Sequence, residues 1–341
     1  MQKTRIAING LGRIGRACLK LALEREELEV VAVNDLGDPE NIAYLLKYDS
    51  VYGASGLEVE ARDDALVING TEIPFVHEKD PKKLPWKKIG VDVVVESTGV
   101  FTDYGDAHMH VKAGAKRVVI SAPAKGTPPK GVEAATVLMG VNHDKLKTCD
   151  ISSNASCTTN AGSPVVAILD EKIGIEKAVL NTIHGYTSTQ DLVDSPNKKI
   201  RRGRAAAMNI VPSSTGAAVA TTQAYTQLSD KFDGIAMRVP VPAGSIVDIT
   251  FIAKEATTVE KVNDALIEAA GEERWKKVFT ATDEPIVSTD ILGSPYASIA
   301  DLEMTRVVDG NLIKVCAWYD NEMGYTHTLI EHIIETGKHA G

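Results

Sequence analysis

The stretch Gly10-Leu11-Gly12-Arg13-Ile14-Gly15 decides the fold of the N-terminal half. A strand-like run over residues 4–9 precedes it, and a helix-like segment over residues 16–26 follows it. A second apolar run, residues 29–34, ends at Asp35, about 20 positions after the last glycine. The glycines therefore lie inside a βαβ unit with the order and spacing of a dinucleotide site.

Each residue of this motif has a predicted task. Gly10 permits the tight turn, Gly12 lets the backbone approach a pyrophosphate, and Gly15 lets the helix pack against the strand. Asp35 is expected to accept hydrogen bonds from a ribose, and its charge would repel a 2′-phosphate, so NAD is predicted rather than NADP. The alternatives are a glycine-rich turn in an ordinary βα unit and an Asp35 that only supports a solvent-exposed turn.

Two further strand-like runs end in polar residues. Residues 91–96 are rich in β-branched side chains and precede Ser97-Thr98-Gly99, while residues 117–120 precede Ser121-Ala122-Pro123. In an open parallel sheet, ligands bind at the carboxyl ends of the strands. We therefore expect both polar ends on the cofactor side, with ordinary loop residues as the alternative.

Cys157 stands in a run of small hydroxyl and amide residues, Ser152 to Asn160, before a helix-like segment. A turn from strand to helix directs backbone N–H groups and the positive end of the helix dipole at the sulfur, which favours the nucleophilic thiolate. The alternative is a buried structural cysteine. His184 is the next histidine and closes a strand-like run, so it is the candidate general base.

Basic residues gather over residues 198–204, near the hydroxyl-rich segment 213–216. A run of charges is usually a solvated face, but arginines beside hydroxyls and backbone N–H groups make an anion site. Arg238 lies within an apolar strand-like run and needs an anionic partner or water. Together these features predict a substrate that carries phosphate.

Composition excludes several classes of function. The 341 residues exceed the usual size of one domain, and 44% hydrophobic with 24% charged residues is ordinary for a globular protein, so we expect two domains. A net charge of −9 argues against nucleic acid or an anionic membrane as partner. The four cysteines lack metal-site spacing, so no metal and a reducing, cytoplasmic compartment are predicted. We find no signal-peptide pattern and no apolar run long enough for a membrane span.

Several motifs together identify a family. They are Gly10 to Arg16, Asn34-Asp35, Leu46 to Ser50, Glu96 to Gly99, Ser121 to Lys125, Ser153 to Asn160 and Trp318-Tyr319-Asp320-Asn321-Glu322. In this order they resemble phosphorylating glyceraldehyde-3-phosphate dehydrogenases over essentially the whole chain. The resemblance implies an α/β fold, with a Rossmann NAD-binding domain over residues 1–156 and an α+β catalytic domain with a mostly antiparallel sheet over 157–320. It also implies a C-terminal helix, 321–341, that packs back on the first domain, and a homotetramer.

The resemblance also implies a role for individual residues. Cys157 matches the nucleophile that attacks the aldehyde, and His184 matches the base. The implied cofactor contacts are Gly10, Gly12, Arg13, Ile14, Gly15, Asp35, Lys79, Ser121, Asn321 and Tyr325. The implied contacts to the substrate's phosphate and to inorganic phosphate are Ser156, Thr158, Thr187, Arg202, Thr215, Gly216 and Arg238.

Three rival functions remain open at this point. Erythrose-4-phosphate dehydrogenase resembles the chain at the same motifs but hydrolyses its thioester. Dehydrogenases of the aspartate-semialdehyde type also join a Rossmann domain to a catalytic cysteine. A non-catalytic, NAD-responsive binding protein is the third. One local feature conflicts with a simple helix after Cys157, because Pro164 predicts either a kink or a helix that begins later.

Overall fold

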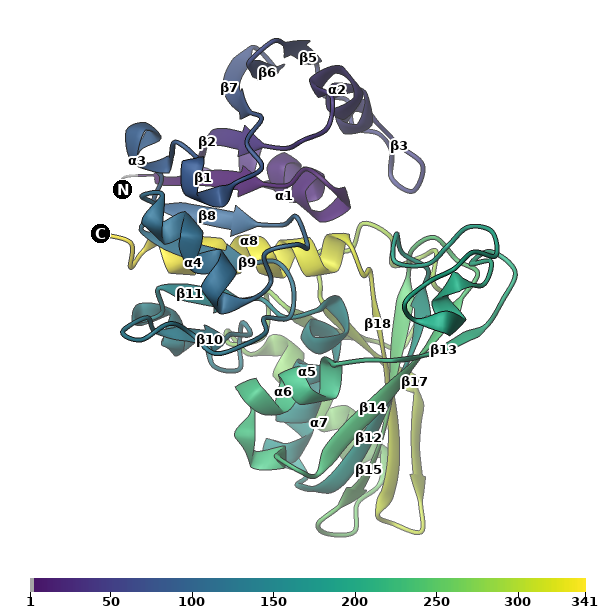
Figure 1. Cartoon of the computed structure of the whole chain (residues 1–341). Helices are drawn as coiled ribbons and strands as arrows, with labels where there is room; N and C mark the ends of the chain where they lie inside the picture. Colours follow the sequence, from purple (N-terminus) through teal and green to yellow (C-terminus); the bar gives the residue numbers. More distant parts are fainter. Residues whose placement is uncertain (1–2) are drawn as a thin grey trace. The chain divides into compact units, whose positions relative to one another are not determined.

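The computed structural model describes residues 3–341, which divide into two compact units (Figure 1). The first unit holds the chain up to Val137, His143–Ala155 and Leu329–Gly341. The second holds Leu138–Asn142 and Ser156–Thr328.

The first unit alternates strands and helices, as the βαβ pattern predicts. Its strands are β1 (Thr4–Asn9), β2 (Leu28–Asn34), β3 (Tyr48–Asp49), β4 (Gly53–Ala54), β5 (Val59–Arg62), β6 (Ala65–Ile68), β7 (Thr71–Val76), β8 (Val93–Glu96), β9 (Arg117–Ile120), β10 (Ala134–Thr136) and β11 (Ile151–Ser153). Its helices are α1 (Arg13–Leu23), α2 (Pro39–Lys47), α3 (Trp86–Ile89) and α4 (Tyr104–Lys112), with short 3₁₀ turns η1 (Pro81–Lys83) and η2 (His143–Lys147).

The strands form a nine-stranded sheet in the order β10-β11-β9-β8-β1-β2-β7-β6-β5. All neighbours from β10 to β7 are parallel, and the hairpins β5–β6 and β6–β7 are antiparallel. The predicted Rossmann-like sheet is confirmed. In β1, Asn9 lies in register with Asn34 of β2 and Glu96 of β8, so three polar residues end three adjacent strands.

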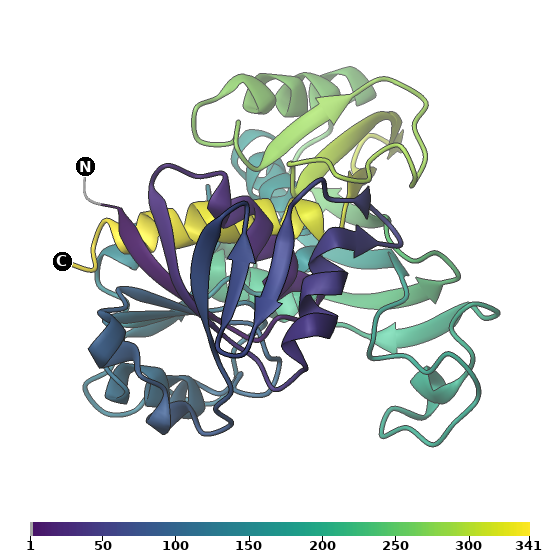
Figure 2. The same ribbon diagram turned by 90° about the horizontal axis from the view of Figure 1, so that it is seen from above.

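Helices cover both faces of this sheet (Figure 2). Ala7 belongs to an apolar cluster with Trp86 of α3 and Ala107 of α4. Because side chains alternate along a strand, Ile6 and Ile8 point to the opposite face. Both faces are buried, which explains why the central strands read as continuous apolar runs.

The second unit contains a mostly antiparallel sheet. Its strands are β12 (Ile175–Gly185), β13 (Val211–Ser214), β14 (Phe232–Val239), β15 (Ser245–Ala253), β16 (Phe279–Thr282), β17 (Ser298–Val308) and β18 (Leu312–Tyr319). Its helices are α5 (Cys157–Lys172), α6 (Ala217–Ala224) and α7 (Val259–Gly271), with 3₁₀ turns η3 (Ile200–Gly203) and η4 (Thr226–Leu228), and α8 (Met323–Gly337) begins here.

This sheet has the order β13-β14-β12-β15-β18-β17-β16, and only β12–β14 and β16–β17 are parallel pairs. The predicted α+β architecture is therefore confirmed. Helices α5, α6 and α7 lie against one face in Figure 1. The alternating burial of β15 places Val247, Ile249 and Phe251 in the core beneath α5.

Helix α5 begins at Cys157 and continues past Pro164 to Lys172. Ser156 is its N-cap, and the Ser156 hydroxyl accepts a hydrogen bond of 3.1 Å from the Thr159 backbone N–H. The alternative that Pro164 delays the start of the helix is therefore wrong. Capping stabilises the first turn and offsets the hydrogen bond that Pro164 cannot donate. Cys157 is thereby held at the first helical position.

The described part of the chain lacks two features. Residues 3–341 contain no helix with the length and apolar character needed to cross a bilayer. They also contain no cluster of three or more acidic, histidine or cysteine side chains that could hold a metal ion.

In the first unit, α8 is held by a buried histidine. His332 accepts a hydrogen bond of 2.7 Å at Nε2 from the Ser152 hydroxyl and donates one of 3.1 Å from Nδ1 to Asn154 Oδ1. The Asn154 oxygen only accepts, which fixes this tautomer of the neutral ring. Burial lowers the pKa of His332 from its ordinary value of 6.5 to about 3.

We expect acid to destabilise the fold through this histidine. Because the folded pKa lies below the unfolded one, the unfolded chain binds a proton that the folded chain refuses between about pH 6.5 and pH 3. The free energy of unfolding should decrease as the pH is lowered through that range, by up to about 1.4 kcal/mol per pH unit for one histidine. Urea unfolding at pH 7, 6 and 5 measures it.

The matched variant is His332→Gln, whose amide can keep both hydrogen bonds but does not titrate. The pH dependence of its unfolding free energy should be flatter than that of the parent chain. It will not vanish, because burial also lowers the pKa of His184. Equal slopes for the two proteins would contradict the role given to His332.

Candidate active site

The predicted nucleophile and base contact each other in the second unit. Cys157 is half-buried at the start of α5, and His184 is buried at the end of β12. The Cys157 Sγ lies 3.3 Å from His184 Nε2. A helix start and a rigid strand thus place a thiol and an imidazole within hydrogen-bond distance, as cysteine catalysis requires.

The other ring nitrogen of His184 lies between a carbonyl and a guanidinium. Nδ1 is 2.6 Å from the Gly185 carbonyl oxygen and 2.8 Å from Arg238 Nη1, which also donates to that oxygen at 2.9 Å. A proton on Nδ1 is donated to Gly185, and this leaves the Nε2 lone pair free to accept the thiol proton. An imidazolium would face the charge of Arg238 directly.

The pKa values follow from these surroundings. Burial, and after it the charge of Arg238, lowers the pKa of His184 to about 3. Burial raises the pKa of Cys157, while Arg238 and the Thr158 N–H act in the opposite direction. At neutral pH the imidazole of the ligand-free chain is therefore uncharged and able to act as a base.

Tyr319 holds the two catalytic elements together, and we did not predict it from the sequence. Its hydroxyl lies 2.9 Å from Thr158 Oγ1 of α5 and 2.7 Å from Thr182 Oγ1 of β12. Its ring packs edge-on against His184, with 5.9 Å between centroids. A signal was present, because Tyr319 lies in the motif Trp318 to Glu322, although that motif gave it no role.

Arg202 and Thr187 belong to one hydrogen-bonded group. Arg202 donates from Nε to Ser213 Oγ at 2.9 Å and from Nη1 to Thr189 Oγ1 at 2.9 Å. Thr189 Oγ1 lies 2.9 Å from Thr187 Oγ1. Ser213 belongs to the hydroxyl-rich segment 213–216 that the sequence places near the arginines, although it was not named as a phosphate contact, and Thr189 was not predicted.

Arg238 has donor capacity that the chain does not use. Its Nε is buried and has no hydrogen-bond partner among the described residues. The charges of Arg238 and Arg202 each lower the pKa of His184, so the two guanidinium groups act on the same ring. Two cations and an unpaired buried donor beside one imidazole favour an anionic ligand.

The remaining predicted phosphate contacts lie at helix starts. Ser156 caps α5, and Thr158 is in its first turn. Gly216 precedes α6, and Thr215 Oγ1 accepts a hydrogen bond of 3.2 Å from the Ala217 N–H. Over residues 3–341, no hydrogen bond joins Thr215 or Gly216 to the arginine groups.

Asn321 is linked to the catalytic strand by one hydroxyl. Ser245 Oγ donates to Asn321 Oδ1 at 3.0 Å and accepts from the Gly185 N–H at 3.2 Å. Both Asn321 and Tyr325 are buried within the second unit. The other predicted cofactor contacts belong to the first unit.

The glycine turn of the first unit has the geometry that its motif predicts. A Cβ on Gly10, whose φ is +96°, would lie 2.7 Å from the Thr98 nitrogen, and a Cβ on Gly15 would lie 1.9 Å from the Gly10 oxygen. A Cβ on Gly12 would meet nothing within 4 Å. Gly10 and Gly15 are therefore required by the fold, whereas the space beside Gly12 at the start of α1 suits a pyrophosphate.

The other cofactor candidates surround this turn. Asp35 accepts hydrogen bonds from the Leu11 N–H at 2.6 Å and the Gly37 N–H at 2.7 Å. Arg13 forms a bidentate ion pair with Asp49, at 2.8 and 3.2 Å. Ile14 is the second residue of α1, Lys79 is exposed, and Ser121 follows β9.

Comparison with known proteins agrees with this geometry. The family model "Glyceraldehyde 3-phosphate dehydrogenase, NAD binding domain" matches residues 4–104, and "Glyceraldehyde 3-phosphate dehydrogenase, C-terminal domain" matches residues 156–321. The chain is 47% identical to a glyceraldehyde-3-phosphate dehydrogenase of Geobacillus stearothermophilus, over 96% of each chain. It is 47% identical to one of Clostridium acetobutylicum and 45% identical to one of Streptomyces coelicolor, over 98% of each chain.

The glycine geometry generates a prediction for NAD binding. Gly12→Ala should leave the thermal unfolding midpoint unchanged, because its Cβ meets no protein atom. The methyl group should still weaken NAD binding by about tenfold or more, since it fills the space beside the helix start. Isothermal titration calorimetry with NAD measures the dissociation constant.

Gly15→Ala is the contrasting variant, because its Cβ overlaps the Gly10 carbonyl. It should lower both the unfolding midpoint and the affinity for NAD. A Gly12→Ala protein that binds NAD as tightly as the parent chain would contradict the assignment of the space beside Gly12.

Proposed function

The chain belongs to the glyceraldehyde-3-phosphate dehydrogenase family, and on that premise we propose that it catalyses the phosphorylating oxidation of D-glyceraldehyde 3-phosphate. It is an NAD-binding oxidoreductase. The proposed reaction consumes NAD⁺ and inorganic phosphate and yields 1,3-bisphosphoglycerate and NADH. The 3.3 Å contact between a half-buried thiol and a neutral imidazole is the observation that carries the proposal.

The first chemical step forms a carbon–sulfur bond. The Cys157 sulfur attacks the aldehyde carbon while His184 Nε2 accepts the thiol proton, and His184 then returns this proton to the aldehyde oxygen to give a hemithioacetal. NAD⁺, held by the glycine turn and Asp35, would supply the oxidant that takes up the hydride. His184 removes the hydroxyl proton at that stage, so the product on Cys157 is a thioester.

Inorganic phosphate completes the reaction. Its oxygen attacks the thioester carbon, the carbon–sulfur bond breaks, and the sulfur leaves as a thiolate that recovers a proton from His184. The thioester retains the energy of aldehyde oxidation in the acyl phosphate. Attack by water would lose that energy, so the site has to favour phosphate.

The arginines and hydroxyl groups of the site match the two phosphates that the proposed reaction requires. We propose that Arg238, Arg202 and Thr187 hold the phosphate of the substrate, and that Ser156, Thr158, Thr215 and Gly216 receive the attacking phosphate together with Arg202. The unpaired Nε of Arg238 supports the first assignment. In the NAD site, Gly10, Gly12, Arg13, Ile14, Gly15 and Asp35 would hold the pyrophosphate and ribose, with Lys79, Ser121, Asn321 and Tyr325 as further contacts.

We also propose a homotetramer and a cytoplasmic location. Large apolar side chains of the loop and strand region between residues 186 and 211 are 70–86% exposed, namely Leu192, Val193, Ile200, Met208 and Ile210. Large apolar side chains exposed along one segment favour a surface that a partner subunit covers. All four cysteines are free thiols, which suits a reducing compartment. We propose that residues 1–156 form the NAD-binding domain and residues 157–320 the catalytic domain. Residues 321–341 are the C-terminal helix proposed to pack back on the NAD-binding domain.

Phosphate dependence tests the proposed reaction. NADH formation from glyceraldehyde 3-phosphate, followed at 340 nm, should require inorganic phosphate in multiple turnovers. The same assay with erythrose 4-phosphate should be slower. Rapid turnover of erythrose 4-phosphate without phosphate would instead identify the hydrolysing rival.

Cys157→Ser is the matched control for this assay. It should lower kcat by about four orders of magnitude or more, because the reaction loses its nucleophile. Its affinity for NAD should remain close to that of the parent chain. Equal turnover of the two proteins would rule out the thioester route.

Asp35 tests the choice between NAD and NADP. Asp35→Asn removes the negative charge that would repel a 2′-phosphate, while it keeps the size of the side chain. The ratio of kcat/KM for NADP to that for NAD should rise by about tenfold or more. Initial rates with each cofactor measure the ratio, and an unchanged ratio would assign the discrimination to another segment.

A further inference from the structure

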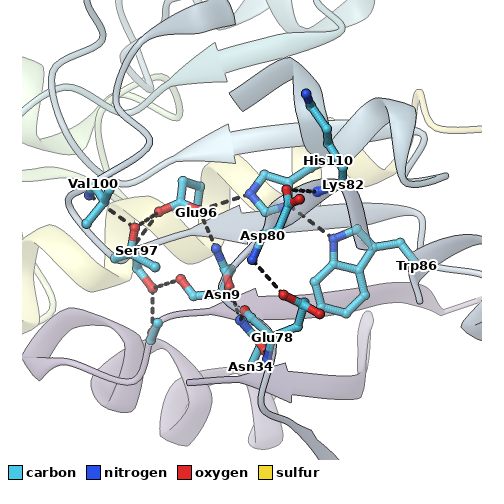
Figure 3. Close-up of polar contacts among 12 residues, drawn as sticks. Asn9, Asn34, Glu78, Asp80, Lys82, Trp86, Glu96, Ser97, Val100 and His110 are labelled. Carbon is cyan, nitrogen blue, oxygen red and sulfur yellow. Dashed lines mark hydrogen bonds and ion pairs between the residues drawn. The ribbon is translucent and has the colours of Figure 1, made fainter. Parts of the chain in front are cut away.

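A buried polar network joins the carboxyl ends of three parallel strands in the first unit (Figure 3). Asn9, Asn34 and Glu96 end β1, β2 and β8, and each is 4% exposed or less. His110 of α4 and Trp86 of α3, both fully buried, extend the network to the helices. The Glu96 network, as we call it, consists of Asn9, Asn34, Trp86, Glu96, Thr98 and His110.

One arm of the network runs from Trp86 through His110. The Trp86 indole N–H lies 3.1 Å from His110 Nδ1, and His110 Nε2 lies 3.0 Å from Glu96 Oε2. An indole nitrogen can only donate, so Nδ1 must be the acceptor. The ring of His110 is therefore neutral, and its one proton is on Nε2 and is donated to Glu96.

A second arm runs from the backbone of Glu78 through two asparagines. Asn34 Oδ1 accepts from the Glu78 N–H at 2.9 Å, and Asn34 Nδ2 donates to the Glu78 carbonyl at 3.0 Å. This pairing fixes the orientation of the Asn34 amide. Asn34 Nδ2 then donates to Asn9 Oδ1 at 2.6 Å, so Asn9 Nδ2 faces Glu96 Oε2 and donates to it at 2.6 Å.

The third arm is the turn that follows β8. The Thr98 N–H donates to Glu96 Oε1 at 2.9 Å, and the Thr98 hydroxyl forms a further, short hydrogen bond to the same oxygen. The Val100 N–H donates to Thr98 Oγ1 at 3.1 Å, so this hydroxyl can accept from the backbone while it donates to Glu96. All three arms thus end on Glu96, which receives four hydrogen bonds and donates none.

Three of the four donors have fixed directions, namely the Asn9 amide, the His110 Nε2–H and the Thr98 backbone N–H. They require an acceptor at both oxygens of Glu96, and an amide in its place would put a hydrogen opposite one of them. All four donors are neutral, so oriented dipoles surround this carboxylate in place of a cation.

The arm through the two asparagines passes beside three segments of the NAD site. Asn9 precedes Gly10, Asn34 precedes Asp35, and Glu78 precedes Lys79. The Ser97 hydroxyl, next to Glu96, donates to the Gly10 carbonyl at 2.7 Å. Glu96 is therefore linked to the segments that carry the glycine turn, the ribose acceptor Asp35 and Lys79.

We propose that Glu96 is a positioning residue for NAD: its ionised carboxylate fixes these segments without touching the cofactor. The proposal rests on the NAD-binding role of this unit and is independent of the substrate. The hydrogen bonds that link Glu96 to Asn9, Asn34 and Glu78 pass beside all three segments, which a role in stability alone would not require.

The test is Glu96→Gln, which keeps the shape of the side chain. Whichever way its amide turns, the NH₂ group faces either the Thr98 N–H or the donors of Asn9 and His110, so one arm is displaced. We expect the dissociation constant and KM for NAD to rise about tenfold or more. At saturating NAD, kcat should stay within about threefold of the parent value. The alkylation rate of Cys157, in the other unit, should not change.

Trp86→Phe is the matched control. It removes the indole donor from the arm that reaches no cofactor segment, and it leaves Glu96 with all four of its hydrogen bonds. It should lower the thermal unfolding midpoint, because Trp86 is fully buried, but the dissociation constant for NAD should stay within about threefold of the parent value.

Each outcome decides the proposal. Unchanged NAD affinity in Glu96→Gln, a loss of kcat without a rise in KM, or a Trp86→Phe variant that weakens NAD binding as much as Glu96→Gln would overturn it. If Glu96→Gln does not fold, Asn34→Ala cuts the arm to Glu78 and leaves Glu96 in place. That variant should raise the dissociation constant for NAD several-fold, and unchanged affinity would overturn the proposal. A defect of the proposed dehydrogenase chemistry is distinguishable, because it would appear in turnover and leave NAD binding unchanged.

Discussion

The contact between Cys157 Sγ and His184 Nε2 is the constraint on which the second unit depends. The surrounding secondary structure fixes the position of each side chain. Cys157 is fixed because Ser156 caps α5, and His184 is fixed because it lies at the end of a strand paired on both sides. Tyr319 then bonds to both elements through Thr158 and Thr182, so a shift of the helix along the sheet would break buried hydrogen bonds.

The sequence predicts those parts of the fold that local rules determine. Residues 4–9 and 117–120 are strands with the expected bounds, and Asn69-Gly70, both with positive φ, form the tight turn between β6 and β7 that an Asn-Gly pair favours. The start of α5 was less certain, because a proline inside a helix argues against it. The cap at Ser156 decided that point, and its strength depends on hydrogen-bond geometry that composition does not reveal.

The site was predictable where chemistry leaves few choices and unpredictable where partners come from distant segments. Cys157 and His184 stood out by residue type, and the structure brings them together. Thr189 did not, because threonine is a common residue and only tertiary structure brings it to Arg202. Ser213 was indicated only as part of the hydroxyl-rich segment 213–216, and its bond to Arg202 depends on tertiary structure. The sequence around His110 carries no signal of a buried partner. Its hydrogen bond to Glu96 depends on the order of strands in the sheet.

The buried carboxylate of Glu96 and the buried guanidinium of Arg238 differ in whether the chain satisfies their hydrogen bonds. Glu96 has every acceptor site filled by the chain, so a ligand would find nothing there to bind. Arg238 keeps a buried Nε without a partner among the described residues, and its charge opposes protonation of His184. An anion beside Arg238 would supply the missing acceptor and relieve that opposition. The same ligand that fills the site would therefore make His184 a stronger base.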